Sequence, residues 1–595
     1  MTSITPEDQN GKIRGLLGFI SILFLILILR LFYLQITTFA DYARESEENR
    51  IAQKRIKAPR GLIYARDGEV LARNRAFYTI ALERSTRQEY DQATAALQEA
   101  IGNIEITSKY SRRHRSLRLI RDVDFRTVSI VEERLKADWP RLDIEIEAQR
   151  SYPHGATAAH LLGYMGILQD EKLKKEGGKT YVAGDFIGKT GLEKVFEDSL
   201  RGRDGVRFIE VGADGRQRRE FPERERPADP GGDLHLTIDL AVQQAAEDAL
   251  PDSLAGSVVA LDPRTGAVLA LASKPNFDPN IFVSFQAQEK RQRVLQSQTT
   301  LLNRAIQGRY PPGSTLKMIS AIAALEEGIT DTLSTFEACA GSLQVGDRFF
   351  HCLERDGHGE LNLIEAMEVS CNIYFHNLAH FLGIDNWQAY ADKFGFGQPT
   401  GIAMEPEETA GLLPSRAYYQ EREGWTLGHL MNLVIGQGAM LVTPIQMARY
   451  TAAIGNGGYL VTPYLCGSPA PPHRIEGVSD ATLEIVKKSM HRVIHGEKGT
   501  GRRVRIEGIE IAGKSGTAQG PRHDDDAWFV AFAPFGVPTI AVVVVVEGGG
   551  GGGSVAGPIA RQVLQAFFTS EKERRRPSTR RSAAASHPAD AWTLR

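Results

Sequence analysis

Three short segments, far apart in the chain, constrain its fold more than any other feature. They are Ser314-Thr-Leu-Lys317, Ser370-Cys-Asn372 and Lys514-Ser-Gly-Thr517. The first pairs a nucleophilic hydroxyl with an amine that can accept its proton, and the second offers a hydroxyl for proton relay. The third combines a cation with two hydroxyls, a group that can seat a carboxylate. Because this is a complete set for acyl transfer, the fold must bring all three segments into one cleft.

The first segment reads as the start of a helix. Pro311-Pro312-Gly313 cannot continue a preceding helix, and the apolar spacing that follows Ser314 is helical. Ser314 and Lys317 are three residues apart and therefore share a helix face. Burial favours loss of a lysine proton, so we expect Lys317 to take the proton of Ser314. Alone, Ser-x-x-Lys is weak evidence, since many surface helices contain it by chance.

The second segment needs an irregular turn. Ser370 and Asn372 follow the helical pattern of residues 361–369, and two residues at this spacing face one cleft only from a turn between helices. We expect Ser370 to carry a proton towards the leaving group. We expect Asn372 to orient Lys317 and to hold a substrate amide through its carboxamide.

The third segment fits a strand. Alternation places the hydroxyls of Ser515 and Thr517 on one face and Lys514 on the other. Gly516 then marks a point where the strand approaches the catalytic helix closely. The backbone N–H groups of Ser314 and Thr517 are the predicted oxyanion hole.

The N-terminal region predicts a membrane anchor. Residues 15–36 form an apolar run of about twenty residues, enough for one helical span. Lys12 and Arg14 precede the run and favour a cytoplasmic N-terminus, which places everything after the run outside the cytoplasm. The alternative is a cleaved signal peptide. An uncleaved anchor fits better, because no small-x-small site follows and apolar residues continue past Arg30.

Length and composition predict several domains. With 595 residues, 42% of them hydrophobic and 24% charged, the chain can bury more than one core, and a net charge of −2 argues against nucleic acid as main partner. A Pro/Gly-rich linker at residues 224–233 marks a boundary. The predicted parts are a cytoplasmic tail (1–14), a transmembrane helix (15–36), a non-catalytic pedestal (37–232), a catalytic domain (233–570) and a basic disordered tail (571–595).

The catalytic domain is predicted to be α+β. A helical pattern follows Asp239, residues 256–272 read as a hairpin, and the β-branched run 539–546 reads as a central strand. Helices flanking an antiparallel sheet follow from this order. Residues 548–553 read as a flexible turn, because the signature of a phosphate loop is lacking. The pedestal segments 60–68 and 188–202 read as structural, because neither holds a nucleophile and base.

The three motifs in this order resemble the penicilloyl-serine transferases, the superfamily of penicillin-binding proteins and serine β-lactamases. The chain is most similar to class B penicillin-binding proteins, and within them to the penicillin-binding protein 2 group of the elongation machinery, whose pedestal is of the dimerisation type. No glycosyltransferase region precedes the linker. The resemblance extends from Arg60 to Phe568 and includes Arg60-Gly, Asp67-Gly68, Tyr152-Pro-x-Gly155, Gly191-Leu-Glu193, Gly436-Gln-Gly438, Thr443-Pro444-x-Gln446 and Trp528-Phe529.

The resemblance implies a D,D-transpeptidase that cross-links peptidoglycan during cell-wall elongation. Ser314 would attack the penultimate D-alanine carbonyl of a stem peptide, while Lys514, Ser515 and Thr517 would seat the terminal carboxylate. β-Lactams should acylate the same serine. Expected partners are the stem peptides of lipid-linked precursor strands, a SEDS-type membrane glycosyltransferase and an elongation scaffold such as MreC. The expected location is the bacterial inner membrane, crossed once, with the bulk of the chain periplasmic.

Other functions use the same residues. A division-type transpeptidase shares all three motifs, although the match at residues 188–202 favours elongation. A serine carboxypeptidase or β-lactamase would use the same serine, but a β-lactamase does not need some two hundred residues between membrane and catalytic domain. A β-lactam sensor or silent scaffold would not need the complete motifs.

Three cysteines and a histidine form a further candidate site. Cys339, Cys352, His358 and Cys371 have the spacing C-x12-C-x5-H-x12-C, and three thiolates with one imidazole suit tetrahedral zinc. Four protein ligands leave no open position, so the role would be structural, and no cofactor is expected for the chemistry itself. The alternative is a Cys339–Cys352 disulfide with Cys371 merely buried. The residues leave both open, and the family resemblance favours zinc.

Overall fold

The computed structural model describes residues 6–38, 51–83, 85–102, 106, 110, 116–168, 175–176, 179–181, 184–212, 217–519 and 524–575. The chain divides into two compact units, each built from separate stretches of sequence. Unit 1 comprises Met1–Pro59, Phe77–Glu147 and Gly202–Pro230, and unit 2 comprises Arg60–Ala76, Ala148–Arg201 and Gly231–Arg595. The predicted boundary at residue 233 therefore does not separate the two compact units, because unit 2 also includes residues 60–76 and 148–201.

The N-terminal region forms one long helix. Helix α1 (Pro6–Phe32) continues into a single π turn, η1 (Tyr33–Thr37). Within them, Gly15–Thr37 is a 23-residue stretch long and apolar enough to cross a membrane, and none of its most apolar window is buried. This stretch coincides with the span expected at residues 15–36.

Unit 1 contains two antiparallel sheets. Strand β1 (Ile51–Ile56) pairs with β10 (Gly205–Val211), which pairs with β11 (Gln217–Glu220). The long strand β3 (Val70–Glu83) belongs to unit 1 from Phe77 onwards and there pairs with β4 (Ser116–Val123); β3 also pairs with β5 (Leu142–Ser151), of which unit 1 holds the residues up to Glu147. Helix α3 (Arg87–Ile101) and α4 (Phe125–Ile130), followed by the π turn η2 (Val131–Leu135), complete a core with β3 and β4, which includes Ile80, Leu82, Leu97, Leu119 and Val131.

Unit 2 is organised by a five-stranded antiparallel sheet. Its order is β14 (Val268–Lys274), β13 (Gly256–Leu261), β21 (Ile540–Val546), β20 (Asp526–Ala533) and β19 (Ala512–Ala518). The expected hairpin is β13–β14, and the β-branched run forms β21 at the centre of the sheet, so both predictions are confirmed. Strand β19 pairs only with β20 within the described residues and forms one edge.

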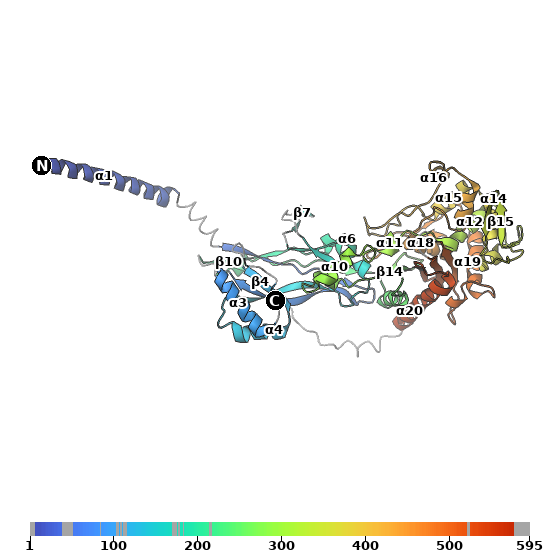
Figure 1. The fold of residues 1–595 in the computed structure, drawn as a ribbon, viewed down its shortest axis with the longest axis horizontal. Coiled ribbons are helices and arrows are strands. Elements are labelled where there is room, and N and C mark those ends of the chain that lie inside the picture. Colours follow the sequence, from blue (N-terminus) through green and yellow to red (C-terminus); the bar gives the residue numbers. More distant parts are fainter. Residues whose placement is uncertain are drawn as a thin grey trace. The chain divides into compact units, whose positions relative to one another are not determined.

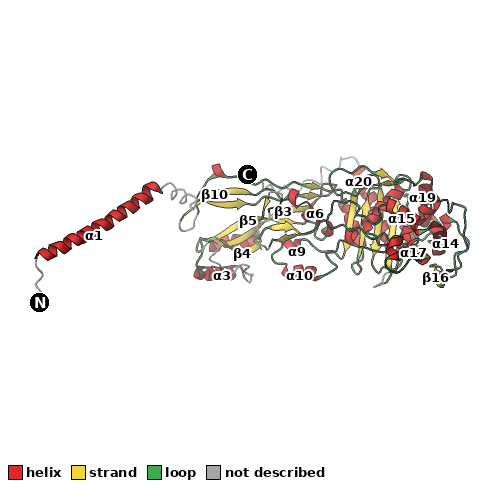
Figure 2. Ribbon diagram, turned by 90° about the horizontal axis from the view of Figure 1, so that it is seen from above, coloured by secondary structure: helices red, strands yellow, loops and turns green. Residues whose placement is uncertain are grey.

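Different helices cover the two faces of the sheet, and α19 and α20, one from each face, are labelled in Figures 1 and 2. Val542 and Val544 belong to a core shared with α8 (Leu240–Ala249) and α20 (Gly557–Arg575). Val543 and Val545 belong to the larger core on the other face. The main helices of that core are α12 (Lys317–Glu326), α14 (Asn372–Leu382), α18 (Pro444–Gly455) and α19 (Asp480–His495).

Shorter elements complete unit 2. The strands are β2 (Ile63–Tyr64), β6 (Met165–Ile167), β7 (Lys175–Glu176), β8 (Lys179–Thr180), β9 (Phe186–Gly188), β12 (Leu234–His235), β15 (Ser342–Val345), β16 (Arg348–His351), β17 (Tyr459–Leu460) and β18 (His473–Arg474). The helices are α5 (Ala159–Leu162), α6 (Gly191–Val195), α7 (Glu197–Leu200), α9 (Asn280–Val283), α10 (Gln288–Gln296), α11 (Arg304–Gln307), α13 (Leu363–Glu368), α15 (Ile384–Lys393), α16 (Arg416–Gln420) and α17 (Leu427–Leu433).

The structure corrects the predicted start of the basic tail. Residues 571–575 are the last turn of α20 and are not part of a disordered tail. Arg574 explains the difference, because its guanidinium forms an ion pair with the buried carboxylate of Asp239 and another, at 3.2 Å, with Glu571. These ion pairs hold the end of the helix in place. The rest of the predicted tail, 576–595, lies outside the described residues.

The pedestal segments 60–68 and 188–202 meet in a buried ionic cluster in unit 2. Glu193, which is fully buried, accepts hydrogen bonds at 2.6 Å from Nε of Arg60 and from Nε of Arg150. The hydroxyl of Tyr152 lies 3.2 Å from the same carboxylate. A buried carboxylate needs such partners to stay ionised. The structural interpretation of segments 60–68 and 188–202 is in agreement with this arrangement.

Candidate active site

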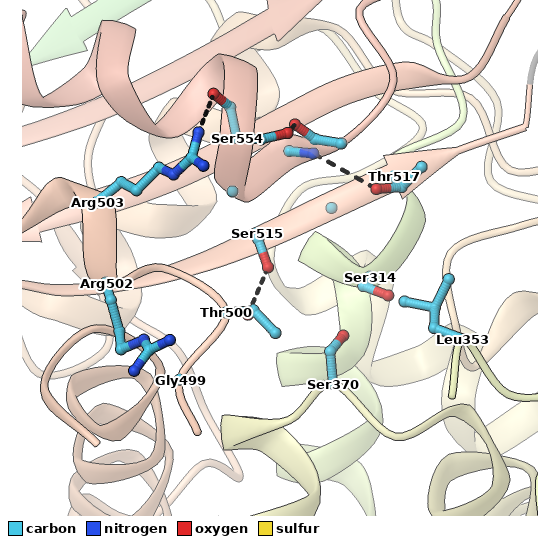
Figure 3. A pocket seen from close by; sticks show the side chains of 14 residues that line it. Ser314, Leu353, Ser370, Gly499, Thr500, Arg502, Arg503, Ser515, Thr517 and Ser554 are labelled. Atoms are coloured by element: carbon cyan, nitrogen blue, oxygen red, sulfur yellow. Dashed lines mark hydrogen bonds between the residues drawn. The ribbon is translucent and has the colours of Figure 1, made fainter. Parts of the chain in front are cut away.

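Ser314 lies at the start of a helix, as its sequence context predicts. Pro312 and Gly313 lead into a 3₁₀ turn, η4 (Gly313–Leu316), and α12 begins at Lys317. Ser314 is 8% exposed and lines a pocket of about 390 Å³. The pocket, seen in Figure 3, is lined by Ser314, Leu353, Ser370, Gly499, Thr500, Arg502, Arg503, Ser515, Gly516, Thr517 and residues Gly551 to Ser554.

Lys317 connects the first two motifs. Its ammonium nitrogen Nζ lies 2.8 Å from the backbone oxygen of Ser370, 3.3 Å from Ser370 Oγ and 2.8 Å from Asn372 Oδ1. Burial lowers the pKa of Lys317 to about 8, although negative charge on Cys371 and Cys352 opposes this shift. Among the described residues, the Ser314 hydroxyl has no hydrogen bond to Lys317. Asn372 thus contacts Lys317, while the roles of both in a reaction stay predictions.

Ser370 occupies the expected turn between helices. It lies between α13 and α14, with a φ of +58°. A non-glycine residue in this left-handed region costs about 1–2 kcal/mol, which the surrounding structure must offset. The conformation places Ser370 Oγ within 3.3 Å of Lys317 Nζ and 2.8 Å of Lys514 Nζ. One hydroxyl therefore links the two lysines of the site.

The side chain of Lys514 contacts Ser370, and its expected role in seating a carboxylate beside Ser515 and Thr517 stays a prediction. Its side chain is fully buried, and Nζ donates to Ser370 Oγ and, at 2.9 Å, to the backbone oxygen of Ser515. Burial, together with the charge of Lys317, holds the pKa of Lys514 well below its ordinary value. Lys514 is not among the residues that line the pocket, because its side chain turns towards Ser370 in the interior.

The strand β19 presents its two hydroxyls to the pocket, as alternation predicts. Ser515 Oγ and Thr500 Oγ1 lie 2.7 Å apart, and Thr517 Oγ1 accepts a hydrogen bond from the backbone of Gly552 at 3.4 Å (Figure 3). Gly516 is the predicted point of close approach. A Cβ atom there would lie 2.8 Å from Thr315 Cγ2, beside the catalytic turn.

The backbones of the first and third motifs are adjacent. A Cβ atom on Gly313 would lie 2.7 Å from the backbone oxygen of Thr517. The backbone at Thr517 therefore lies beside the turn that carries Ser314. The predicted pair of oxyanion donors, the N–H groups of Ser314 and Thr517, requires such an adjacency and stays a prediction.

Several pocket residues were missed by the sequence analysis. Gly551 to Ser554 form part of the wall, and the π turn η6 (Gly552–Ala556) begins there, so the predicted flexible turn at 548–553 is partly wrong. The reason is packing: a Cβ on Gly552 would lie 2.2 Å from the backbone oxygens of Gly516 and of Trp528. Arg502 and Arg503, on the 3₁₀ turn η5 (Arg502–Val504), also carried no sequence signal beyond their charge.

A substitution at Gly436 tests the packing behind Ser314. The backbone N–H of Gly313 donates to Gly436 O at 2.8 Å, and a Cβ on Gly436 would lie 2.0 Å from Gly313 O. Gly438 has a similar φ, +81° against +75°, but its Cβ would meet Asn432 Cβ at 3.3 Å. We expect Gly436→Ala to destabilise the protein by about 1–3 kcal/mol more than Gly438→Ala. The midpoints of thermal unfolding of the two variants measure this difference, and equal midpoints would contradict it.

The predicted metal ligands lie together at the second motif. Cys352 Sγ lies 3.4 Å from His358 Nδ1 and 3.9 Å from Cys371 Sγ, and Cys339 Sγ lies 3.7 Å from His358 Nδ1. All four donor atoms lie within 4.8 Å of one another, and the sulfurs are free thiols, not joined in a disulfide. A hydrogen bond with Cys371 lowers the pKa of Cys352. Tetrahedral zinc with three sulfurs and one nitrogen requires separations of about 3.5–3.8 Å, so this set fits the ion.

Family models match both parts of the chain. Residues 256–565 match the penicillin-binding protein transpeptidase domain, and residues 55–236 match the penicillin-binding protein dimerisation domain. The peptidoglycan D,D-transpeptidase MrdA of Haemophilus influenzae is 35% identical over 598 residues, which is 93% of this chain and 91% of the relative.

Solved structures are similar over most of the chain. The complex between penicillin-binding protein PBP2 and MreC from Helicobacter pylori contains a chain with a TM-score of 0.76 and 26% identity, covering 88% of this chain and 99% of that one. A chain from a peptidoglycan synthase complex, described as coordinating polymerization and crosslinking, has a TM-score of 0.71 and 30% identity, covering 94% and 98%.

The catalytic motifs, the order of the two domains and the similar proteins all indicate the same protein family. The chain has the transpeptidase and dimerisation domains in one sequence, and the expected resemblance is confirmed. The cited MrdA relatives are named peptidoglycan D,D-transpeptidases and are matched over 91% of their length, which favours this activity over the β-lactamase and silent-scaffold alternatives. The chain therefore belongs to the class B penicillin-binding proteins, as a peptidoglycan D,D-transpeptidase of the elongation (PBP2, MrdA) type.

Proposed function

We propose that Ser314 is the nucleophile and Lys317 the base of the transpeptidation reaction. Ser314 Oγ attacks the penultimate D-alanine carbonyl of a donor stem peptide and gives its proton to neutral Lys317. Lys317 and Ser370 return that proton to the leaving amine, so the terminal D-alanine departs and the acyl group stays on Ser314. The observation that supports these roles best is the direct contact of Lys317 with Ser370 and Asn372.

The second half of the reaction uses the same groups. An amine of a neighbouring stem peptide attacks the acyl-enzyme carbonyl and loses a proton to the Lys317–Ser370 pair. The proton passes to Ser314 Oγ as the ester bond breaks, which regenerates the enzyme and leaves one new amide cross-link. Backbone N–H groups of Ser314 and Thr517 stabilise both tetrahedral oxyanions.

The donor carboxylate is proposed to bind the hydroxyls of Ser515 and Thr517. Lys514 then acts through its contact with Ser370, because its buried Nζ does not reach the pocket surface. In this arrangement Lys514 positions the relay hydroxyl of Ser370. β-Lactams, which carry a strained acyl group and a carboxylate, should enter the same pocket and acylate Ser314.

A cross-linking assay tests this function. Full-length protein is incubated with glycan strands that have been polymerised from lipid-linked precursor, and released D-alanine and dimeric stem peptides are counted. We expect one D-alanine for each cross-link formed. D-Alanine release without dimers would instead indicate a carboxypeptidase, and rapid β-lactam hydrolysis without a stable adduct would contradict the proposed deacylation by an amine.

The acylation rate should depend on pH through Lys317. The pKa of Lys317 is lowered to about 8, and only its neutral form can accept the Ser314 proton. Below pH 8 the protonated fraction is inactive, so the second-order rate of penicillin acylation should rise about tenfold per pH unit and level off above pH 8. Stopped-flow acylation between pH 5.5 and 9.5 measures this, and a rate that falls over the range would contradict neutral Lys317 as base.

Membrane placement and partners are proposed from the anchor and the relatives. The Gly15–Thr37 helix would cross the inner membrane once with the N-terminus in the cytoplasm, leaving the catalytic unit in the periplasm. A relative is solved with MreC, and another in a synthase complex that couples polymerization with crosslinking. By analogy, we propose that this chain works with an MreC-type scaffold and a SEDS-type glycosyltransferase on lipid-linked precursor strands.

The set of Cys339, Cys352, His358 and Cys371 is proposed to hold one structural zinc ion. The separations of the donor atoms support this, and the alternative disulfide would leave His358 and Cys371 without a role. The ion supplies a cross-link between the β15–β16 hairpin region and the Ser370 turn. Cys371 itself is the residue between Ser370 and Asn372, so the ion would fix the position of the relay hydroxyl.

A further inference from the structure

A second group of metal-ligating side chains lies in unit 2, away from Ser314 and from the cysteines. His491 and His495 are four residues apart near the end of α19, and they share one face of that helix. Glu510 lies just before β19. One donor atom from each of the three residues lies within 4.8 Å of the others, and both histidines are only partly exposed.

One imidazole nitrogen of this group offers a lone pair close to the carboxylate. His491 Nε2 lies 2.5 Å from Glu510 Oε2 and donates to it, whereas His495 Nε2 accepts a hydrogen bond from the backbone N–H of Ile511 at 3.3 Å. His495 Nε2 therefore carries the lone pair that this N–H contacts, and it lies 3.8 Å from the same carboxylate oxygen. A cation bound between the nitrogen and the carboxylate would replace the hydrogen bond from Ile511 and attract both groups.

Neighbouring contacts hold the group in place. The two imidazole rings stack at 4.3 Å between centroids, and the ring of His491 lies 5.0 Å from that of Phe535. The backbone oxygen of Glu510 accepts a hydrogen bond from Phe535 N at 2.8 Å. Arg505 is the charged neighbour that would oppose a cation, but its guanidinium donates to the backbone oxygens of Ile494 and Gly496, which take up part of its charge.

We propose that His491, His495 and Glu510 form a second zinc site, with two nitrogens, one carboxylate oxygen and water in the fourth position. Zinc takes such a set at Zn–N and Zn–O distances of about 2.0–2.2 Å, which requires ligand separations of about 3.3 Å. The observed separations bracket this value, so modest rotations of the side chains complete the site. The proposal does not depend on the catalytic roles assigned above.

The ion would act as a clamp on two walls of the active-site pocket. His495 is four residues before Gly499 and five before Thr500, and Glu510 is four residues before Lys514. Gly499 and Thr500 line the pocket on one side, and β19 forms the other. A zinc ion that joins His495 to Glu510 therefore ties together the first residues of both walls.

Metal analysis of the full-length protein in detergent tests the site. Protein stripped with a chelator is equilibrated with excess Zn²⁺, passed over a desalting column and analysed for zinc per chain. The comparison includes Glu510→Gln, His491→Ala and, as matched control, His473→Ala, which removes an exposed histidine on β18. Cys352→Ser serves as a background that disables the cysteine set, so the two metal sites are counted separately.

In the Cys352→Ser background we expect one zinc per chain, retained in His473→Ala. Loss of a ligand should weaken zinc binding at least about tenfold in His491→Ala and in Glu510→Gln. Cobalt substitution in this background should give no thiolate-to-metal absorption. Zinc content that is unchanged by both substitutions, or absent already in the background, would overturn the proposal.

Hydrogen exchange tests the clamp itself. In the same background, added Zn²⁺ should slow amide exchange in residues 496–511, and Glu510→Gln should abolish this protection. Zinc that binds without any protection of this segment would show that the ion does not join the two walls. Penicillin acylation, measured in parallel, reports separately on the function of Ser314.

Discussion

Ser314→Ala is expected to abolish the covalent adduct with a labelled penicillin. Because Ser314 is the proposed nucleophile, loss of its attacking oxygen should lower adduct formation by about 10³-fold or more. Intact-mass analysis of the full-length protein after exposure to the penicillin measures this. The wild-type protein should gain the mass of one penicillin, and the adduct should persist, because deacylation by water is slow in the absence of an acceptor amine.

Ser554→Ala is the matched control for this experiment. Ser554 lines the same pocket, but its Oγ donates at 3.0 Å to the backbone oxygen of Gly551 and has no contact with Lys317 among the described residues. The control should acylate at a rate similar to that of wild type. An adduct that survives in Ser314→Ala would move the nucleophile to another residue and would contradict the mechanism.

Cys352→Ser is expected to release one zinc ion and to destabilise the Ser370 turn. A structural zinc ion with four protein ligands contributes several kcal/mol to folding, and each kcal/mol corresponds to about 2–4 °C in the melting temperature of a domain of this size. We therefore expect a lower thermal midpoint and slower acylation, since Cys371 adjoins the relay hydroxyl of Ser370. Metal content, thermal unfolding and penicillin acylation are measured on the same preparation.

Cys466→Ser controls for the loss of a thiol as such. Cys466 is a partly buried free cysteine outside the ligand set. The control should keep its zinc and its midpoint. Equal zinc content in Cys352→Ser and wild type would refute the cysteine site, and a midpoint that rises on treatment with an oxidant would favour the alternative disulfide.

Much of the catalytic unit could be predicted from local sequence. The run of β-branched residues in β21 fits only the centre of a sheet, and the proline pair before Ser314 fits only the start of a helix. Gly516 was expected at a close approach because a strand interior rarely uses glycine otherwise. Each of these predictions depends on a residue and its neighbours in the chain.

Local sequence does not predict interactions between residues that are distant in the chain. Lys514 Nζ contacts Ser370 Oγ, 144 positions earlier, and no local pattern indicates this contact. The end of α20 is fixed by an ion pair between Arg574 and Asp239, and neither residue signals the other in the sequence. Likewise, Gly552 lies in the predicted flexible turn, but it packs against the backbones of Gly516 and Trp528, which no local pattern predicts.

The two compact units are built from alternating stretches of the chain, and this limits where the protein can be cut to obtain a catalytic fragment. The core beneath Ser314 includes Ile63, Leu71, Leu161 and Leu192, all of which precede residue 233 in the chain. A fragment that begins at the linker would leave the partners of these four side chains exposed to water, at a cost of about 25 cal/mol for each Å² of apolar surface. An autonomous catalytic fragment must therefore carry residues 60–76 and 148–201 as well, joined to the rest by short artificial connections.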